Sequence, residues 1–231
     1  MTFNLKIMLT LGFLMTLSNA EKLRLKRADV LESKKIGFET VKHLQGNVQF
    51  EKGDIKLNCQ RSVYKERKDI AFLFNQVKIF KDDLILECDS ITFYSKKNKL
   101  ESNGNPIIYD LGYKLVADSL IYFTELDSGI ALGNVELIQN DQKIKADRIE
   151  YVKNPGSEAI SYIAIGNVEI IDSLRTATCG LANYNDITEK TILGREPIII
   201  DEQRTIVGEQ VILQYDKKSL SRILIPNNAK I

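Results

Sequence analysis

Three aspartates recur at one spacing, and a regular series of carboxylates could do chemistry. Asp89, Asp118 and Asp147 follow one another at intervals of 29 residues. Carboxylates bind calcium, and carboxylate pairs hydrolyse glycosidic bonds. No second acid stands at a constant offset from these three, and an aspartate at a bend commonly hydrogen-bonds its own backbone. We therefore interpret the series as structural and keep a carbohydrate-active β-helix enzyme as an alternative.

The other reactive residue types are few. His43 is the single histidine, which excludes zinc sites built on several histidines and any acid/base pair of histidines. We expect it to be exposed near a turn. Cys59, Cys88 and Cys179 have no C-x-x-C spacing, and no phosphate loop or nucleophile elbow occurs. The sequence therefore predicts no catalytic residue, no metal site and no cofactor.

Aromatic residues also recur at one position and could stack on sugars or bases. The chain has 32 basic and 31 acidic residues, a balance that gives no argument for nucleic acid as a partner. Core packing, or the lining of an apolar groove, is the better interpretation. The recurring aromatics are Tyr64, Phe93, Tyr122, Tyr151 and Tyr184.

These aspartates, cysteines and aromatic residues occupy fixed positions of a sequence repeat. Its first block is Gly46-Asn47-Val48, which recurs as Asn75-Gln76-Val77, Gly104-Asn105-Pro106, Gly133-Asn134-Val135 and Gly166-Asn167-Val168, with a degenerate copy that ends at Pro197. Successive copies lie 29 residues apart except for one step of 33, where the turn-rich residues 154–157 are inserted. The second block reads Leu57-Asn58-Cys59-Gln60 and recurs at the same spacing, as in Ile144-Lys145-Ala146-Asp147. We count six copies.

Each copy reads as bent β-strands. Apolar and polar residues alternate, and β-branched residues are frequent. Cys59 and Tyr64 are five residues apart, so plain alternation would put them on opposite faces although both are apolar. A bend near Gln60 and its equivalents restores them to one side, and Gly-Asn, which tolerates unusual φ, marks the matching bend. We predict an all-β, elongated jellyroll of stacked antiparallel strands in two facing sheets.

This arrangement predicts free, buried cysteines. With two strands per repeat, equivalent residues are roughly 10 Å apart, too far for a disulfide between Cys59 and Cys88. If each repeat were a single solenoid turn, they would be about 5 Å apart and could bond.

The two ends differ from the repeats. Residues 1–20 resemble a cleavable secretory signal, with Lys6 before an apolar stretch and a small-residue end at Ala20; a retained anchor is the alternative. Residues 21–231 then form one domain. Ala28–Leu31 resembles a second block alone and Leu220–Pro226 a first block alone, so both ends are half copies. Residues 21–43 are ambiguous and could be partly helical.

The pattern Leu132-Gly133-Asn134-Val135, turn, Ile144-Lys145-Ala146-Asp147-Arg148-Ile149-Glu150-Tyr151 is similar to the LptA/OstA-like family. The resemblance extends over nearly all of residues 23–226. It implies a β-jellyroll with a hydrophobic groove and a periplasmic carrier that takes lipopolysaccharide from the inner to the outer membrane. It also implies end-to-end strand pairing, near residues 23–32 and 219–226, with inner-membrane and outer-membrane OstA-like proteins or with further copies of itself.

The sequence thus favours a non-enzymatic lipid carrier over two alternatives, a structural β-solenoid without ligand and the enzyme considered above. The residues expected to line the groove are the inward apolar ones of each copy. They are Val48, Phe50, Leu57, Ile79, Leu86, Phe93, Ile108, Leu115, Tyr122, Leu137, Ile144, Tyr151, Ile170 and Tyr184.

Overall fold

The computed structural model describes residues 21–110, 112–139, 141–154, 159–201, 204–216 and 219–226. The expected signal segment lies outside the described residues, as does most of the 154–157 insertion. The described part of the chain is almost entirely β-strand, with one short 3-10 helix, η1 (Ser95–Lys97), and contains no helix long and apolar enough to cross a membrane. The all-β prediction is confirmed.

The strands follow one another along the chain. The N-terminal ones are β1 (Arg24–Arg27), β2 (Val30–Ile36), β3 (Glu39–Lys52), β4 (Ile55–Lys65), β5 (Ile70–Lys81), β6 (Leu84–Tyr94), β7 (Lys99–Asn103), β8 (Ile107–Asp110), β9 (Tyr113–Val116) and β10 (Ser119–Phe123). The C-terminal ones are β11 (Ser128–Gln139), β12 (Gln142–Lys153), β13 (Ile160–Ile171), β14 (Arg175–Asn185), β15 (Lys190–Gly194), β16 (Ile198–Asp201), β17 (Arg204–Val207), β18 (Gln210–Asp216) and β19 (Ser219–Leu224).

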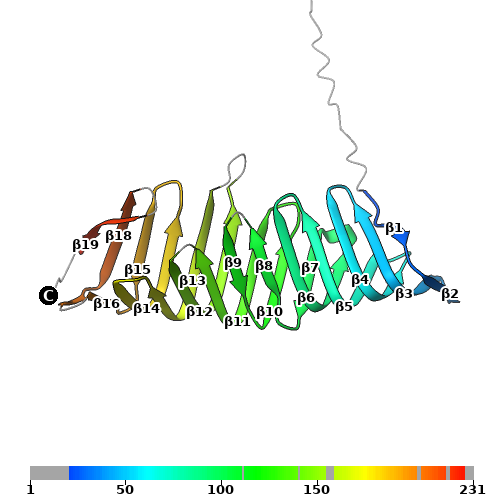
Figure 1. Cartoon of the computed structure of the whole chain (residues 1–231), viewed down its shortest axis with the longest axis horizontal. Helices are drawn as coiled ribbons and strands as arrows, with labels where there is room; N and C mark the ends of the chain where they lie inside the picture. The colour runs from blue at the N-terminus through cyan, green and yellow to red at the C-terminus, as the bar shows by residue number, and fades with distance from the viewer. Residues whose placement is uncertain are drawn as a thin grey trace, which may run out of the picture.

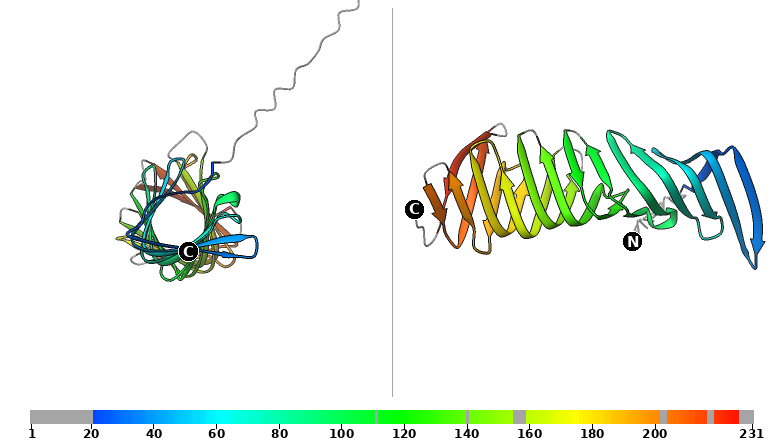
Figure 2. Two further views of the ribbon diagram at one scale, coloured as in Figure 1. Left: turned by 90° about the vertical axis from the view of Figure 1, so that its right-hand side faces the viewer. Right: turned by 60° about the horizontal axis from the view of Figure 1, so that its bottom comes forward.

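Consecutive strands pair antiparallel, so the chain advances along one axis and the molecule is elongated (Figure 1). Viewed along that axis, the strands wrap around an interior, because each long strand bends and passes from one sheet to the other (Figure 2). The expected jellyroll of bent antiparallel strands is confirmed.

The bend lies at the Gly-Asn positions that the repeat predicts. Gly133 and Asn134 both have positive φ, at 73° and 43°, and together stand opposite the single residue Asp147 of the next strand. The pairing of β3 with β4 shifts in the same way at Gly46 and Asn47. This is a β-bulge, and its extra residue restores the inward face on both sides of the bend.

Proline decides which strands are divided at the bend. Where the position after Gly-Asn is valine, as at Val135 and Val168, one strand runs through. The strand is divided at Pro106, which follows Gly-Asn, into β7 and β8, and at Pro197, which follows Arg195-Glu196, into β15 and β16. Proline has no N–H to donate to the ladder and so interrupts it.

The N-terminal segment is extended, and the expectation that residues 21–43 could be partly helical is wrong. β1 and β2 pair along the two halves of β3, and Asp29 stands between them opposite the first bulge. Ala28–Leu31 is therefore a second block, as its sequence suggested. An edge strand needs only one neighbour to satisfy half of its backbone groups, and the ladder of β3 supplies it.

Candidate functional site

The candidate site is the apolar interior between the two sheets. Buried side chains from Leu23 to Leu213 form a single hydrophobic cluster. Thirteen of the fourteen expected lining residues are buried in it, and the remaining one, Tyr151, is half-buried and packs against it. The interior is filled by these side chains, so a ligand would have to part the two sheets to reach them.

Aromatic rings contact one another within this interior. Phe50 and Tyr64 meet edge to face with ring centroids 5.5 Å apart, and Tyr162 stacks on Tyr184 at 4.9 Å. Tyr184 also meets Tyr215 edge to face at 6.3 Å. Such pairs stabilise a core beyond the area they bury.

The inward tyrosines end in hydrogen bonds to carboxylates that the sequence reading missed. Tyr64 donates to Asp69 over 2.7 Å, Tyr122 to Asp127 over 2.8 Å, and Tyr184 to Asp186 over 2.7 Å. Burial, and then these carboxylates, raise the pKa of all three tyrosines. An aspartate that follows the tyrosine by two or five residues was the available signal.

The repeated aspartates lie on the outer side of the bend and hold it. Asp118 accepts a hydrogen bond from Asn134 Nδ2 at 2.9 Å, and Asp147 accepts one from Asn167 at 2.9 Å. Asp29 does the same for Asn47 at 2.8 Å. The series is structural, but the bond goes to the neighbouring strand and not, as expected, to the aspartate's own backbone.

Gly166 shows how closely this bend is packed. A Cβ added there would lie 2.4 Å from Asp147 Oδ2, and φ at this residue is +75°. Both the φ and the close packing favour glycine, although Asn75 and Arg195 adopt a positive φ at the equivalent position of other copies.

Opposite the bend, two rows of turns face each other, and we call the space between them the mouth. The turns of the first row join β3 to β4, β5 to β6, β8 to β9, β11 to β12 and β13 to β14. The turns of the second row join β4 to β5, β6 to β7, β10 to β11, β12 to β13 and β14 to β15. Hydrogen bonds between the two rows show where they meet.

Lys52 and Lys81 cross the mouth at equivalent positions of the repeat. Lys52 Nζ donates to Ser95 O over 2.5 Å and to Asn98 Oδ1, and the residue is only 8% exposed. Lys81 Nζ donates to Thr124 O over 2.7 Å and pairs with Asp127. Each lysine reaches a turn that lies 43 residues further along the chain.

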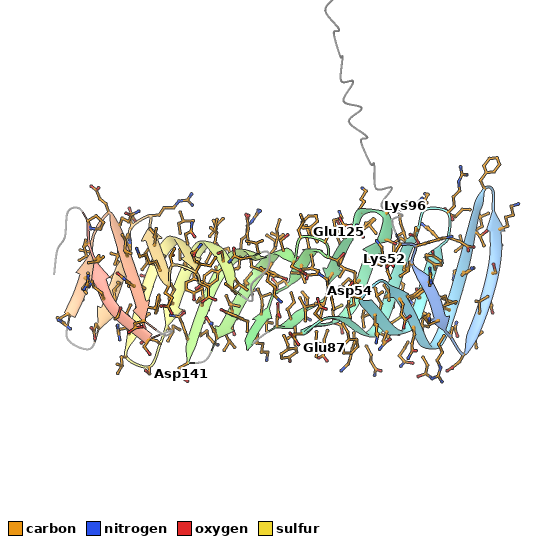
Figure 3. The ribbon with its side chains drawn as sticks, turned by 90° about the horizontal axis from the view of Figure 1, so that it is seen from above. Lys52, Asp54, Glu87, Lys96, Glu125 and Asp141 are labelled. Carbon is orange, nitrogen blue, oxygen red and sulfur yellow. The ribbon has the colours of Figure 1, made fainter. Side chains whose placement is uncertain are left out.

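The environment of these ammonium groups is partly dry. Burial lowers the pKa of Lys52, against the opposite effect of the carboxylates of Asp69, Glu125 and Glu21. In Figure 3, Lys52, Lys96 and Glu125 are labelled close to one another over the ribbon. Burial also acts to raise the pKa of Asp127, but hydrogen bonds from Lys81 and Tyr122 outweigh it, and this pKa lies below its usual value.

The contacts across the mouth weaken toward the C-terminus. At the third copy Asp110 faces Lys153 at 3.9 Å, beyond hydrogen-bonding distance, and Asp110 Oδ1 is buried without a hydrogen-bond partner. Burial raises the pKa of Asp110. At the fourth copy the contact is between Gln142 Nε2 and Tyr215 Oη at 3.4 Å.

Two cavities lie where these contacts weaken. A small one of about 30 Å³ is enclosed by Asp110, Tyr113, Tyr151 and apolar neighbours. A larger one of about 420 Å³ opens between the β11–β12 and β13–β14 turns on one side and Tyr184, Tyr215 and Leu220 on the other.

The cysteines contribute to this interior only as small apolar side chains, and the histidine lies outside it. All three cysteines are free; Cys59 and Cys179 are buried as expected, whereas Cys88 is half-buried. Burial raises the pKa of Cys59 and of Cys88 to about 11, which leaves little reactive thiolate at neutral pH. His43 is exposed, as predicted, but it lies within β3, opposite Val63 of β4, and not near a turn. Within the described ranges, no three His, Cys, Asp or Glu side chains are grouped to hold a metal ion.

Comparison with known proteins finds a match to one protein family. Residues 114–219 match the family described as LptA/(LptD N-terminal domain) LPS transport protein. Among solved structures, the chain is similar to LptH, the LptA homologous periplasmic component of the conserved lipopolysaccharide transport device from Pseudomonas aeruginosa. That similarity covers 52% of this chain and 94% of that chain, with 15% sequence identity and a TM-score of 0.42. No curated protein matches in sequence.

Proposed function

We propose that the chain is a non-enzymatic periplasmic carrier of lipopolysaccharide of the LptA/OstA-like type, on the ground that residues 114–219 match that family. In this proposal the acyl chains travel inside the jellyroll between the inner and the outer membrane, and the protein performs no chemical reaction on them.

The continuous apolar cluster is the observation that carries this proposal. A lipid with several acyl chains cannot cross water unaided, because each CH₂ that leaves water is worth about 0.8 kcal/mol. Fully buried residues such as Leu57, Leu86 and Ile144 succeed one another along the whole axis. When the sheets part, these side chains exchange contact with one another for contact with acyl chains, so the interior stays dry.

The two ends support assembly with similar jellyrolls. At the N-terminal end β2 pairs with β3 alone in the described part of the chain and exposes Val30, Leu31 and Ile36. At the C-terminal end β19 has one described neighbour, β18. Open strand edges accept a further strand from a partner. We propose inner-membrane and outer-membrane OstA-like proteins, or a second copy of this chain, as those partners.

Site-specific photocrosslinking in the periplasm tests the carrier. A photoreactive residue at Leu86 or Leu115 points inward and should capture lipopolysaccharide. The matched control is Glu87, which follows Leu86 on the same strand and makes an ion pair with Lys78 on the outer surface; Figure 3 labels it at the edge of the ribbon. We expect capture from the inward positions and none from Glu87. Equal capture, or none at all, would leave a structural solenoid with a filled core.

A further inference from the structure

The mouth of the interior is closed in one half and open in the other, and one repeat position accounts for the difference. In the first four copies this position holds Lys52, Lys81, Asp110 and Gln139, and in the last two it holds Asp172 and Asp201. The two lysines bond across the mouth, the aspartate stands 3.9 Å from Lys153, and Gln139 lines the cavity of about 420 Å³. The closing contact is thus lost where the cavity begins.

The chemistry of this cavity suits an amphiphile. Three of its lining residues, Tyr184, Tyr215 and Leu220, belong to the hydrophobic cluster or pack against it, so the cavity borders the apolar interior. Its rim carries polar groups such as Gln142 and Asp172. The volume lies within the range of roughly 300–1,000 Å³ typical of pockets that hold small molecules.

We propose that this cavity is a lateral port through which one acyl chain of an amphiphile enters or leaves the interior. The proposal rests on the carrier function proposed above and specifies where along the molecule the lipid passes the mouth. The lysine contacts of Lys52 and Lys81 keep the first half shut, so exchange takes place between the β11–β12 turn and β18.

A matched pair of tyrosines allows a direct test. Tyr64 in the closed half and Tyr184 at the port occupy the same position of the repeat, are 3% and 7% exposed, and donate to an aspartate over the same 2.7 Å. The chain contains no tryptophan, so Tyr64→Trp and Tyr184→Trp each create a single fluorescent reporter. The probe is octadecanoic acid brominated on its chain, which quenches tryptophan fluorescence on contact, followed by stopped flow.

We expect the reporter of Tyr184→Trp to be quenched at least about tenfold faster than that of Tyr64→Trp. Opening the closed half requires breaking hydrogen bonds to charged groups, each of which is worth about tenfold or more in an equilibrium constant. Equal rates, or faster quenching of the Tyr64→Trp reporter, would overturn the port but leave the carrier intact. Absence of quenching in both variants at equilibrium would overturn the carrier itself.

A variant that closes the port provides a second test. Gln139→Lys restores the lysine of the earlier copies at a cavity that Tyr184, the hydrogen-bond donor to Asp186, also lines. We expect this change to slow quenching of the Tyr184→Trp reporter several-fold, whereas Gln139→Met should not. Unchanged rates in Gln139→Lys would contradict the port. Should either tyrosine variant fail to fold, Tyr215→Trp and Phe93→Trp report from the same two regions.

Discussion

The two halves of the molecule are built from one repeat but close their mouth differently. From β3 to β10, Lys52 and Lys81 bind the opposite turns through hydrogen bonds. From β11 to β18, the described residues include a hydrogen bond of 3.4 Å across the mouth, between Gln142 and Tyr215, beside a cavity of about 420 Å³. The bend on the other side is the same in both halves, held by an aspartate and an asparagine at Asp29–Asn47 and at Asp147–Asn167.

This difference shows that the residues that determine the shape of the jellyroll are not the ones that close its mouth. The inward apolar residues and the Gly-Asn bend repeat with little change, so the jellyroll continues along the whole chain. The turn residue represented by Lys52 and Gln139 varies, and it alters only how firmly the mouth is shut. A repeat protein can therefore change access to its interior without changing its core.

The largest expected contrast is in packing. Phe93 is 0% exposed in the closed half, whereas Tyr215 borders the cavity in the open half. We expect Phe93→Ala to lower the free energy of unfolding by roughly 3–5 kcal/mol. Tyr215→Ala should cost about 1–2 kcal/mol, because less of its surface leaves water. Urea denaturation of both variants measures this, and equal losses would mean that the two halves are packed alike.

Next in size is the loss of one lysine from the mouth. Lys81→Met should destabilise the protein by about 1–3 kcal/mol, since Thr124 O and Asp127 lose a charged donor. Its control is Lys78→Met, which removes an ion pair with Glu87 from the exposed surface and should cost no more than about 1 kcal/mol. Similar losses from both would show that Lys81 contributes no more than a surface pair.

Two mouth carboxylates should respond to pH in opposite directions. The pKa of Asp127 is lower in the folded protein than in the unfolded chain, so its contribution stabilises above the unfolded value and is lost as pH falls through the folded value. The pKa of Asp110 is raised, chiefly by burial, so its charged form destabilises at neutral pH and protonation on acidification relieves this.

Accordingly, Asp127→Asn should destabilise the protein at pH 7 and Asp110→Asn should stabilise it. Both effects should shrink on going to about pH 3, where the carboxylates of the unfolded chain are mostly protonated. Thermal denaturation at the two pH values measures this. The same sign for both substitutions at pH 7 would mean that these two positions of the mouth do not differ electrostatically.

The smallest effect concerns the thiols. Cys59 is buried and Cys88 half-buried, and the pKa of each is raised to about 11. We expect a maleimide to label Cys88 slowly and Cys59 more slowly still in the native protein, and all three cysteines in denaturant. Mass spectrometry of the labelled chain counts the adducts, and a single free thiol in denaturant would mean that a disulfide had formed.

Much of the fold could be predicted because the positions of apolar residues and of Gly-Asn in each repeat indicate where the strands bend. The change of parity between Cys59 and Tyr64 required a bend, and Gly-Asn marked the second one. The secondary structure of residues 21–43 could not be predicted, because this charged segment lacks the alternation of apolar and polar residues. It forms strands because β3 supplies their hydrogen-bond partners. The inward residues could be named, but packing and contact with lipid select the same apolar types.

The mouth could not be predicted. A lysine in a turn, such as Lys52 or Lys81, normally remains solvated, and nothing local distinguishes these two from Lys78. Their role depends on turns 43 residues further on, which approach only when the bend has folded the two sheets together. For the same reason Tyr–Asp pairs such as Tyr122–Asp127 became recognisable only in the structure.

The central claim is that the interior of this jellyroll carries lipopolysaccharide. Mass spectrometry of lipid extracted from the protein, purified from the periplasm without denaturant, tests it most directly. We expect lipid A species in the extract of the wild-type chain. We expect less in that of Leu86→Arg, which places a charge in the apolar interior. A folded wild-type protein that releases no lipid A, or equal amounts from both proteins, would contradict the account.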